Sequence, residues 1–425
     1  MKMLIKLAYR NVFRYKRRTL ITFLTISLGL AMLIITVCLI DGADKQGITN
    51  LIDSQVSHFK ICRKDYFEKK DDLPLNLTIK EPERIHNLLK NVPAVMESES
   101  RIIFNGSLIK GMDELPCQGV AIEPGRDMRI LNIRRSLIEG TWLEDDESKV
   151  LVGKNLAKDI GLAVGDIITL RLITSSGDED LTWNALDVEI KGIFDSGNPN
   201  VDRQYVMMPL GLARSGLGLG AEATEILVRL KTDARNDRTL TKIQGQIEEA
   251  LKPDTQGLGA FSWKESAALI LAVSKEKRRQ NALVILITLF IAAMGIINTM
   301  LMAVFERTRE IGMLAALGLR KAEIKKLFVL EGSIIGIFGS LVGCILGGLG
   351  GWYYETYGFR LASMGESGDK IIGAFAPVKD IFYGDLSFEI LVSTFLLGVF
   401  ISIISSFYPA SKATRLNPIE ALKHI

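Results

Sequence analysis

Four long runs of uncharged, mostly apolar residues constrain this chain more than any other feature. They cover residues 20–40, 282–305, 332–352 and 390–408, and the first contains sixteen apolar residues, one glycine and four serines or threonines. A helix needs roughly 20 apolar residues to cross the hydrocarbon core of a bilayer, so each run is about long enough to span it. Four such runs are not expected among the buried helices of a soluble fold. The sequence therefore predicts four transmembrane helices.

The composition indicates that a folded polar domain accompanies these helices. The chain has 425 residues and is 48% hydrophobic, with a mean hydropathy of +0.22, yet 24% of its residues are charged. These values agree only if the apolar residues are concentrated in the four runs. The segment 41–281, between the first two runs, is long enough to bury a core of its own. Disorder and a small disulfide-rich scaffold are excluded by the apolar content and by the four cysteines.

The distribution of lysine and arginine predicts the orientation in the membrane. The leader 1–19 carries seven basic residues and no acidic one, and the loop 306–326 carries six basic and three acidic residues. By contrast, the loop 355–387 has three basic and five acidic residues. Because cytoplasmic flanks are enriched in positive charge, both termini and the loop 306–326 are expected in the cytoplasm, and 41–281 outside. The first run is too long for a signal peptide and predicts an uncleaved anchor. The basic residues thus report topology, and no nucleic-acid partner is expected.

The leader also has a helical pattern. Its basic residues recur at every fourth position, which places them along one side of a helix: Lys2, Lys6, Arg10, Arg14 and Arg18. Apolar residues such as Leu4 and Leu7 lie on another side. This pattern is typical of an amphipathic helix on an anionic inner leaflet. A basic flank with no further role explains the same charges equally well.

The segment 41–281 reads as mixed α/β. Apolar periodicity predicts helices over 81–90 and 239–251 and strands over 167–173 and 225–230, with strand and helix signals mixed over 149–159. Two further strands, 186–194 and 204–208, are separated by a Gly-Asn-Pro-Asn turn. Residues 214–220 are expected to form a glycine-rich surface loop. An amphipathic helix over 263–279 is expected to continue into the second span as a stalk.

No catalytic constellation is recognisable. The chain lacks the G-x-x-x-x-G-K-[ST] motif of nucleotide-binding loops and the G-x-S-x-G elbow, and its three histidines, His58, His86 and His424, are far apart. We therefore expect no catalytic, cofactor-binding or metal-binding residues in this chain. Cys62 and Cys117 both lie in the outer segment, where a disulfide is permitted. They form a candidate disulfide, and two inert buried thiols are the alternative.

Six glycines recur along the third span at spacings of three and four residues: Gly332, Gly336, Gly339, Gly343, Gly347 and Gly351. Residues at these spacings share one helix face, and a face without side chains lets another helix approach closely. A single G-x-x-x-G is a weak signal, but a ridge along the whole span favours tight helix packing. A loosely packed, flexible helix is the alternative.

The loop after the second span predicts a short helix from about 307 to 317, with Gly318 as its left-handed stop. One edge is charged and the other is apolar, and the candidate contact residues of this loop are Glu306, Arg307, Arg309, Glu310, Ile311, Leu314 and Gly318. Such a helix beneath the membrane can dock into a groove on a soluble partner. A solvated re-entry loop would show the same residues.

Three regions of the chain, the leader, the loop after the second span and the tail, resemble the FtsX/MacB/LolC superfamily of ABC-transporter permeases. The leader L-A-Y-R-N-V-F-R-Y-K-R-R-T (7–19) resembles the entry to their first span, and E-R-T-R-E-I-G…L-G (306–318) resembles their coupling helix. The tail segments Y-P-A-S-K-A (408–413) and N-P-I-E-A-L (417–422) resemble their C-terminal signature. Outer segments 150–157, 161–166 and 190–197 are most similar to the LolC/LolE lipoprotein-releasing permeases. MacB proteins carry a fused ATPase that is missing here, and FtsX proteins have a smaller outer domain.

The resemblance implies an α-helical membrane protein with four transmembrane helices and a large α/β extracytoplasmic domain inserted between helices 1 and 2. The implied segments are a leader 1–19, spans 20–40, 282–305, 327–354 and 388–408, an outer domain 41–281, a coupling loop 306–326, an outer loop 355–387 and a tail 409–425. The outer domain would comprise a membrane-proximal part, 41–114 with 216–281, and an inserted part, 115–215. The location implied is the bacterial inner membrane, with the large domain in the periplasm.

The resemblance also implies the partners and the mode of action. The implied partners are a LolD-like ATPase dimer that binds ATP and magnesium, a second permease (a paralogue or a second copy), membrane lipid, a lipoprotein substrate and a LolA-like periplasmic carrier. The segment 172–187, which matches the carrier-binding hook, is acidic and proline-free and so departs from the family pattern. ATP-driven motion of the partner would be transmitted to the outer domain. A MacB-like exporter, an FtsX-like regulator of a wall hydrolase and a membrane-anchored enzyme are the alternatives.

Overall fold

The computed structural model describes residues 2–14, 16–131, 133–145, 147–175, 181–232, 236–254, 256–360 and 381–414. These residues form two compact units. One contains the described residues of 2–45, 273–360 and 381–414, and the other contains those of 46–272. The tail signature 417–422 and the tip of the hook segment, 176–180, lie outside the described residues.

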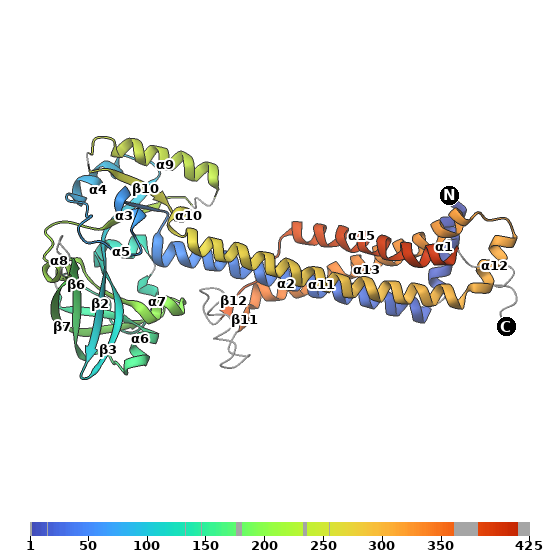
Figure 1. Cartoon of the computed structure of the whole chain (residues 1–425), viewed down its shortest axis with the longest axis horizontal. Coiled ribbons are helices and arrows are strands. Elements are labelled where there is room, and N and C mark those ends of the chain that lie inside the picture. Colours follow the sequence, from blue (N-terminus) through green and yellow to red (C-terminus); the bar gives the residue numbers. More distant parts are fainter. Residues whose placement is uncertain are drawn as a thin grey trace. The chain divides into compact units, whose positions relative to one another are not determined.

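The first unit is helical (Figure 1). Its elements are α1 (Lys2–Arg14), α2 (Lys16–Leu51), α11 (Ala268–Glu306), α12 (Thr308–Ala316), α13 (Lys321–Tyr357), the short strands β11 (Phe359–Arg360) and β12 (Ile381–Phe382), and α15 (Phe388–Ala413). Four of the helices, α2, α11, α13 and α15, are long and apolar enough to cross a membrane, which confirms the four predicted spans. The amphipathic helix expected over 263–279 is interrupted at Ala267, between α10 (Trp263–Ser266) and α11.

Small residues allow α13 and α15 to lie side by side (Figure 1). The buried face of α15 consists mainly of small side chains, among them Gly398, Ser402, Ser406 and Ala410. The Ser406 hydroxyl donates to the Ser402 carbonyl at 2.6 Å, which satisfies that polar group within its own helix. With no hydrophobic driving force between helices in lipid, such close packing supplies the association energy.

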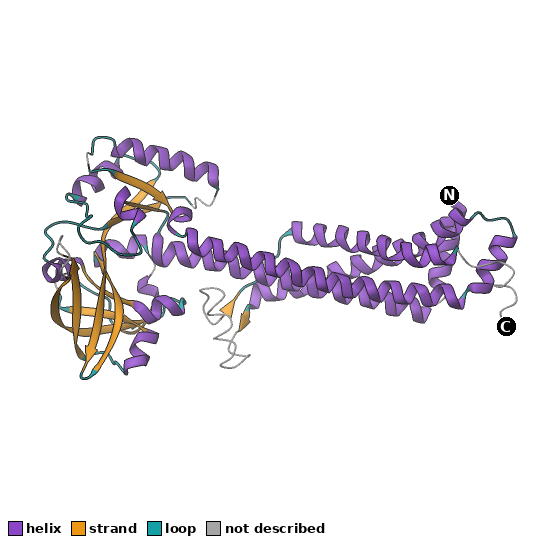
Figure 2. Ribbon diagram, viewed as in Figure 1, coloured by secondary structure: helices purple, strands orange, loops and turns teal. Residues whose placement is uncertain are grey.

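The second unit contains most of the strands (Figure 2). Its strands are β1 (Phe59–Arg63), β2 (Val95–Lys110), β3 (Asp113–Ile122), β4 (Leu137–Gly140), β5 (Lys149–Gly153), β6 (Ile167–Ser175), β7 (Leu181–Phe194), β8 (Tyr205–Pro209), β9 (Glu225–Leu230) and β10 (Leu258–Ser262). Its remaining helices are a π-helix (Ile52–Val56), α3 (Lys64–Glu68), α4 (Pro82–Lys90), α5 (Pro124–Ile130), a 3₁₀-helix (Ile133–Ser136), α6 (Lys154–Ile160), α7 (Pro199–Gln204), α8 (Leu210–Leu217) and α9 (Asp237–Leu251). The α/β class predicted for this segment is confirmed.

Strand pairing divides this unit into two lobes that share β2. The order is β10-β1-β9-β2-β3-β8-β5-β7-β4, and β6 pairs with both β2 and β7, so that six strands close into a ring. Residues 95–101 of β2 pair with β9, whereas 102–110 pair with β3. The change of partner between Arg101 and Ile102 marks the junction of the two lobes, earlier in the chain than the boundary at about 115 that the family resemblance implies. One apolar cluster fills the ring and another fills the lobe of β1, β9 and β10.

The prediction of a glycine-rich surface loop over 214–220 is wrong. Helix α8 continues to Leu217 and ends at Gly218, whose φ is +67°. Gly216 is buried, and a Cβ there would lie 2.7 Å from a methyl group of Leu186. Glycine is therefore present because α8 packs closely on the strands, and not because the chain is mobile. The main-chain carbonyl of Gly216 accepts from the Asn184 amide at 2.7 Å.

Two other expectations differ from the structure. Strands 186–194 and 204–208 do not form a strand–turn–strand pair, because β5 lies between β7 and β8 and α7 occupies the connection. The Cys62–Cys117 disulfide is also wrong, because both cysteines are free, buried thiols. Cys62 lies on β1 opposite Gly259, whereas Cys117 lies in the apolar cluster of the ring. Burial raises the pKa of each thiol to about 12, which keeps both unreactive.

Candidate functional site

Helix α12 lies between two spanning helices and is joined to α11 by one residue, Arg307. The sequence predicted a helix over 307–317, and the structure places α12 at Thr308–Ala316. Gly318 follows with φ +92°, a conformation that L side chains rarely adopt. Hydrogen bonds continue through the joint, from Arg307 N to the Ala303 carbonyl and from Ile311 N to the Arg307 carbonyl. Displacement of α12 is therefore coupled to α11 through a short, bonded connection.

The joint is held by a buried ion pair. Glu331, on α13 next to the glycine ridge, is 1% exposed, and Arg307 is 4% exposed. The Arg307 guanidinium donates to both carboxylate oxygens of Glu331, at 3.1 and 3.2 Å, and its Nε donates to Glu310 at 2.8 Å. An ionised carboxylate at this depth is costly unless it is paired and hydrogen-bonded, and here it is both.

The same carboxylate anchors the leader helix. Asn11 of α1 is buried, and its amide donates to Glu331 at 2.6 Å. Arg14, three residues further on, forms an ion pair with Glu310 at 3.1 Å. One face of α1 packs on α13, while Tyr9 and Phe13 remain exposed. The amphipathic helix expected from the leader is thus also a docked helix, an arrangement that neither interpretation of the leader's charges included.

These contacts divide the predicted coupling residues into two groups. Arg307, Glu310 and Ile311 face the helical unit, and Ile311 belongs to an apolar cluster with Ile324 and Phe328 of α13. Leu314 is half-buried. The exposed predicted residues are Glu306, Arg309 and Gly318, and Met313 and Leu317, which sequence reasoning did not select, are exposed beside them. α12 therefore has one face bound to its own unit and one face accessible to a partner.

The glycine ridge of α13 faces two different helices. At its N-terminal end, Gly332 and Gly336 lie against Ser406 and Ser402 of α15. The next three, Gly339, Gly343 and Gly347, lie against Ile26, Ser27, Leu30, Ala31 and Ile34 of α2, and Gly351 lies against Leu386 and Cys38. The Ser27 hydroxyl donates to the Gly339 carbonyl at 3.0 Å, a contact that requires the two backbones to be close.

The β-sheet unit contains a polar cluster that sequence reasoning missed. Ligand atoms of Glu83, His86 and Glu123 lie within 4.8 Å of one another, as in some metal sites. However, Arg126 forms ion pairs with Glu83 at 3.3 Å and with Glu123 at 3.1 Å. The two ring nitrogens of His86 contact serine hydroxyls at 2.6 and 2.8 Å. Arg126 supplies the positive charge that a cation would bring, so these residues fit a structural ion-pair cluster.

The buried His86 makes the stability of this unit sensitive to acid. Burial, followed by repulsion from Arg126, lowers its pKa to about 4 from an ordinary 6.5. Because the unfolded chain binds the proton first, the free energy of unfolding should fall as the pH drops from about 6.5 to about 4. We expect His86→Gln to flatten this acid-side slope in unfolding curves of the purified protein. An equal slope in the variant and in the wild type would contradict the assignment.

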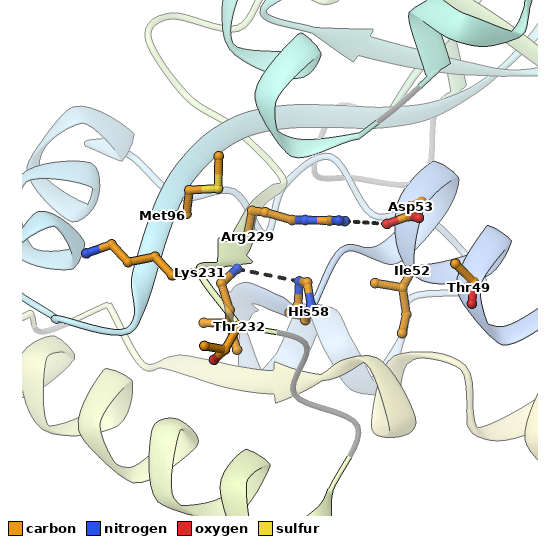
Figure 3. A pocket seen from close by; sticks show the side chains of 9 residues that line it. Thr49, Ile52, Asp53, His58, Met96, Arg229, Lys231 and Thr232 are labelled. Atoms are coloured by element: carbon orange, nitrogen blue, oxygen red, sulfur yellow. Dashed lines mark hydrogen bonds and ion pairs between the residues drawn. The ribbon is translucent and has the colours of Figure 1, made fainter. Parts of the chain in front are cut away.

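A polar cavity of about 360 Å³ lies beside the end of α2 (Figure 3). Its lining includes Asp53 of the π-helix, His58, and Arg229 and Lys231 at the end of β9 and just after it. Arg229 donates to Asp53 at 2.6 Å, and the main-chain N of Leu230 lies 3.5 Å from His58 Nδ1. Ser57, directly after the π-helix, has φ +53°, which is strained for a residue with a side chain. The ion pair thus joins the π-helix to β9 next to an irregular backbone segment.

Sequence reasoning did not single out Glu331 or Asn11 as site residues. Glu331 is separated from Arg307 by 24 positions and from Asn11 by 320, so periodicity within one helix could not pair them. One signal was present: an ionisable residue inside an apolar helix is by default a functional candidate. Asn11 gave no such signal.

Comparison with known proteins places this architecture in a family. Residues 19–246 match the MacB-like periplasmic core domain, and residues 282–418 match the FtsX-like permease C-terminal domain. LolC, a lipoprotein-releasing system transmembrane protein of Neisseria meningitidis, is 24% identical over 421 residues, which cover 96% of this chain and 94% of LolC. LolE of Haemophilus influenzae is 22% identical, with 93% and 92% covered.

Other relatives belong to the exporter branch. MacB of Campylobacter jejuni, a macrolide export ATP-binding/permease protein, is 24% identical over 98% of this chain and 60% of MacB. Among solved structures, the periplasmic region of MacB from Actinobacillus actinomycetemcomitans aligns with a TM-score of 0.35 and 13% identity, covering 50% of this chain and 91% of that one. The two domain matches and the full-length relatives define an ABC-transporter permease subunit. The chain belongs to the FtsX/MacB/LolC superfamily, and its relatives in the comparison include both LolC/LolE and MacB proteins.

Proposed function

We propose that this chain is a lever that carries the motion of a separate ATPase to an extracytoplasmic domain. The observation that supports it is the buried Arg307–Glu331 pair, which joins α12 to α13 at the point where α11 ends. A partner that pushes on the exposed face of α12 would move α11 directly and α13 through the ion pair. In this proposal both termini and α12 are cytoplasmic, as the basic flanks favour, and residues 46–272 are periplasmic.

The cargo we propose is a lipoprotein, extracted from the outer leaflet of the inner membrane for transfer to the outer membrane. Full-length similarity to LolC and LolE supports this choice. Removing acyl chains from a bilayer costs about 0.8 kcal/mol per CH₂, so a triacylated anchor needs tens of kcal/mol, which requires ATP. Apolar side chains exposed on α2 and α11, such as Met32, Leu286 and Phe290, would face lipid, a second permease or the acyl chains.

The partners in this proposal follow from the same relatives. A LolD-like ATPase dimer would bind ATP and magnesium and dock on α12, and a second permease, a paralogue or a second copy, would complete the membrane part. A LolA-like carrier would receive the lipoprotein. The described residues of the stretch that matches the carrier-binding hook, 172–175 and 181–187, belong to the paired strands β6 and β7.

The docking surface can be tested without disturbing the ion pair. Leu317 is 79% exposed at the end of α12, and Leu317→Asp should weaken ATPase binding by about 2 kcal/mol, roughly 30-fold, if this residue is central to the interface. Thermal stability should not change, because the side chain makes few contacts of its own. Copurification of the ATPase, measured by mass spectrometry of the complex, gives the result.

Met112→Asp is the matched control, since Met112 is fully exposed in the β-sheet unit. It should leave ATPase binding intact. Undiminished copurification of the ATPase with Leu317→Asp would rule out this face as the docking surface. Glu310→Lys is less informative, because Glu310 pairs with Arg307 and Arg14 inside the permease.

A MacB-like exporter of peptide, toxin or drug is the second candidate, supported by the similarity to MacB over 98% of this chain. Vesicles containing the permease, its ATPase and a triacylated lipoprotein separate the two candidates. ATP-dependent release of the lipoprotein to the soluble fraction is the result expected from our proposal. Lipoprotein that remains in vesicles with active ATPase would favour the exporter.

A further inference from the structure

The junction of the two lobes of the β-sheet unit contains four buried charged residues beside buried hydroxyl groups such as Ser100 and Thr224. Glu99 and Arg101 lie on β2 just before it changes partner, Asp127 lies on α5, and Glu225 lies on β9 opposite Arg101. Their exposed fractions are 0%, 3%, 0% and 1%, respectively. Charged side chains are almost never this buried unless they are paired.

The contacts within this group are unequal. The Arg101 guanidinium makes a close ion pair with Asp127, while its Nε lies 3.6 Å from Glu99 Oε1. Glu99 Oε1 accepts from the main-chain N of Glu123 at 3.2 Å. Glu225 is paired with Lys60 at 2.6 Å. The second oxygens of Glu99 and Asp127 have no hydrogen-bond donor among the described residues.

Counting charges shows a surplus. Glu99, Asp127 and Glu225 contribute three carboxylates, whereas Arg101 and Lys60 contribute two cations. The carboxyl groups of Glu99 and Asp127 flank the same guanidinium, that of Arg101, and each has one buried oxygen without a donor among the described residues. Two carboxyl groups can hydrogen-bond to each other only if one of them carries a proton. A single proton between them would remove the surplus charge and satisfy an oxygen that otherwise has no donor. Two like carboxylates that share a site commonly behave in this way.

We propose that Glu99 and Asp127 form a buried acid pair that binds one proton at neutral pH and thereby holds the two lobes together at β2. Loss of this proton would leave an uncompensated negative charge in the interior. The junction would then open to water, beginning at the contacts that Glu99 makes with Glu123 and Arg101. The site is independent of the cargo and of the ATPase.

The charges and burial around Glu99 and Asp127 agree with a shared proton. Burial is the largest cause that raises the pKa of Glu99, which lies well above its usual range, and burial also raises the pKa of Asp127. Arg101 opposes both effects. The other titratable groups that act on the pair and its counterions are Glu123, Glu225 and Lys60, while Tyr205, whose pKa is raised to about 12, stays neutral.

The sign of the pH dependence follows from this arrangement. Because the folded protein holds the proton more tightly than the unfolded chain, stability is greatest below the unfolded pKa and declines as the pH rises toward the folded one. This decline is opposite in direction to that caused by His86. Glu99→Gln keeps the side-chain shape and can donate its amide to Asp127, but it carries no charge.

The test uses the full chain in nanodiscs and two readouts. Infrared difference spectra at about pH 7 should contain the carbonyl band of a protonated carboxyl group that is lost in Glu99→Gln and in Asp127→Asn. Between about pH 6 and pH 9 the melting temperature of the wild type should fall, and that of Glu99→Gln should fall by less than about half as much. Glu97→Gln, on the same strand and paired with exposed Arg129, is the control and should resemble the wild type in both measurements.

A pair in which both carboxyl groups are ionised would give different results in both measurements. If both carboxyls are ionised, neither variant will remove a carbonyl band, and Glu99→Gln will lower the melting temperature equally at every pH because it only breaks an ion pair. Either result would overturn the proposal. Asp127→Asn removes the charge from the other partner and so provides the test if Glu99→Gln does not fold.

Discussion

Replacing Glu331 with alanine should both destabilise the helical unit and abolish ATP-driven release of cargo. The change leaves Arg307 buried without its bidentate partner, and it removes the acceptor of Asn11. Breaking a buried pair from one side costs about 3–5 kcal/mol, because the remaining charge is uncompensated. Unfolding of the purified permease in detergent measures the first effect, and release of lipoprotein from vesicles with the ATPase measures the second.

Two controls separate stability from coupling. Glu389→Gln, exposed in the first turn of α15, should alter neither measurement. The double variant Arg307→Met with Glu331→Met removes both charges, and such exchanges are often neutral or stabilising. We expect it to recover most of the lost stability but not the release, since the polar connection between α12 and α13 is absent. Full release by the double variant would show that the ion pair is structural and does not transmit the motion.

The elements that were predicted well are those whose signal is local. Helix α12 and its stop at Gly318 follow from neighbouring residues, and the four spans follow from length and apolar content. The glycine spacing likewise needs only the period of a helix. It could not reveal that Gly332 and Gly336 face α15 while Gly339 and Gly343 face α2, because that depends on which helices surround α13.

The features that sequence reasoning missed depend on residues far apart in the chain. β2 was not predicted from the sequence, and its change of partner after Arg101 depends on strands that lie far away in the chain. The glycine-rich segment around Gly216 predicts a surface loop, because glycine is equally expected in a loop and where a helix must approach a sheet. Glu99 and Asp127 become a pair only when α5 folds against β2.

Substitutions at Gly343, in the glycine ridge, and at Gly348, outside it on the same helix, should have different effects on stability. A Cβ at Gly343 would lie 3.0 Å from the Ser27 main-chain oxygen and 3.0 Å from Leu30 Cβ, whereas a Cβ at Gly348 would meet only a Leu391 methyl group at 3.6 Å. Gly343→Ala should therefore push α2 away from α13 and cost about 1–3 kcal/mol, as overpacking does. The Ser27 main chain cannot relieve this clash by changing rotamer, as a side chain could.

Gly348→Ala is the matched change on the same helix. It should be neutral or stabilising, because alanine is favoured over glycine in a helix by about 1 kcal/mol and the added methyl group has room. Thermal unfolding of both variants in the same nanodiscs supplies the comparison, and cysteine cross-linking between α2 and α13 reports their separation. If the two substitutions shift the melting temperature equally, the glycines are not needed for the close approach of α2 to α13. That result would favour the alternative of a flexible, loosely packed helix.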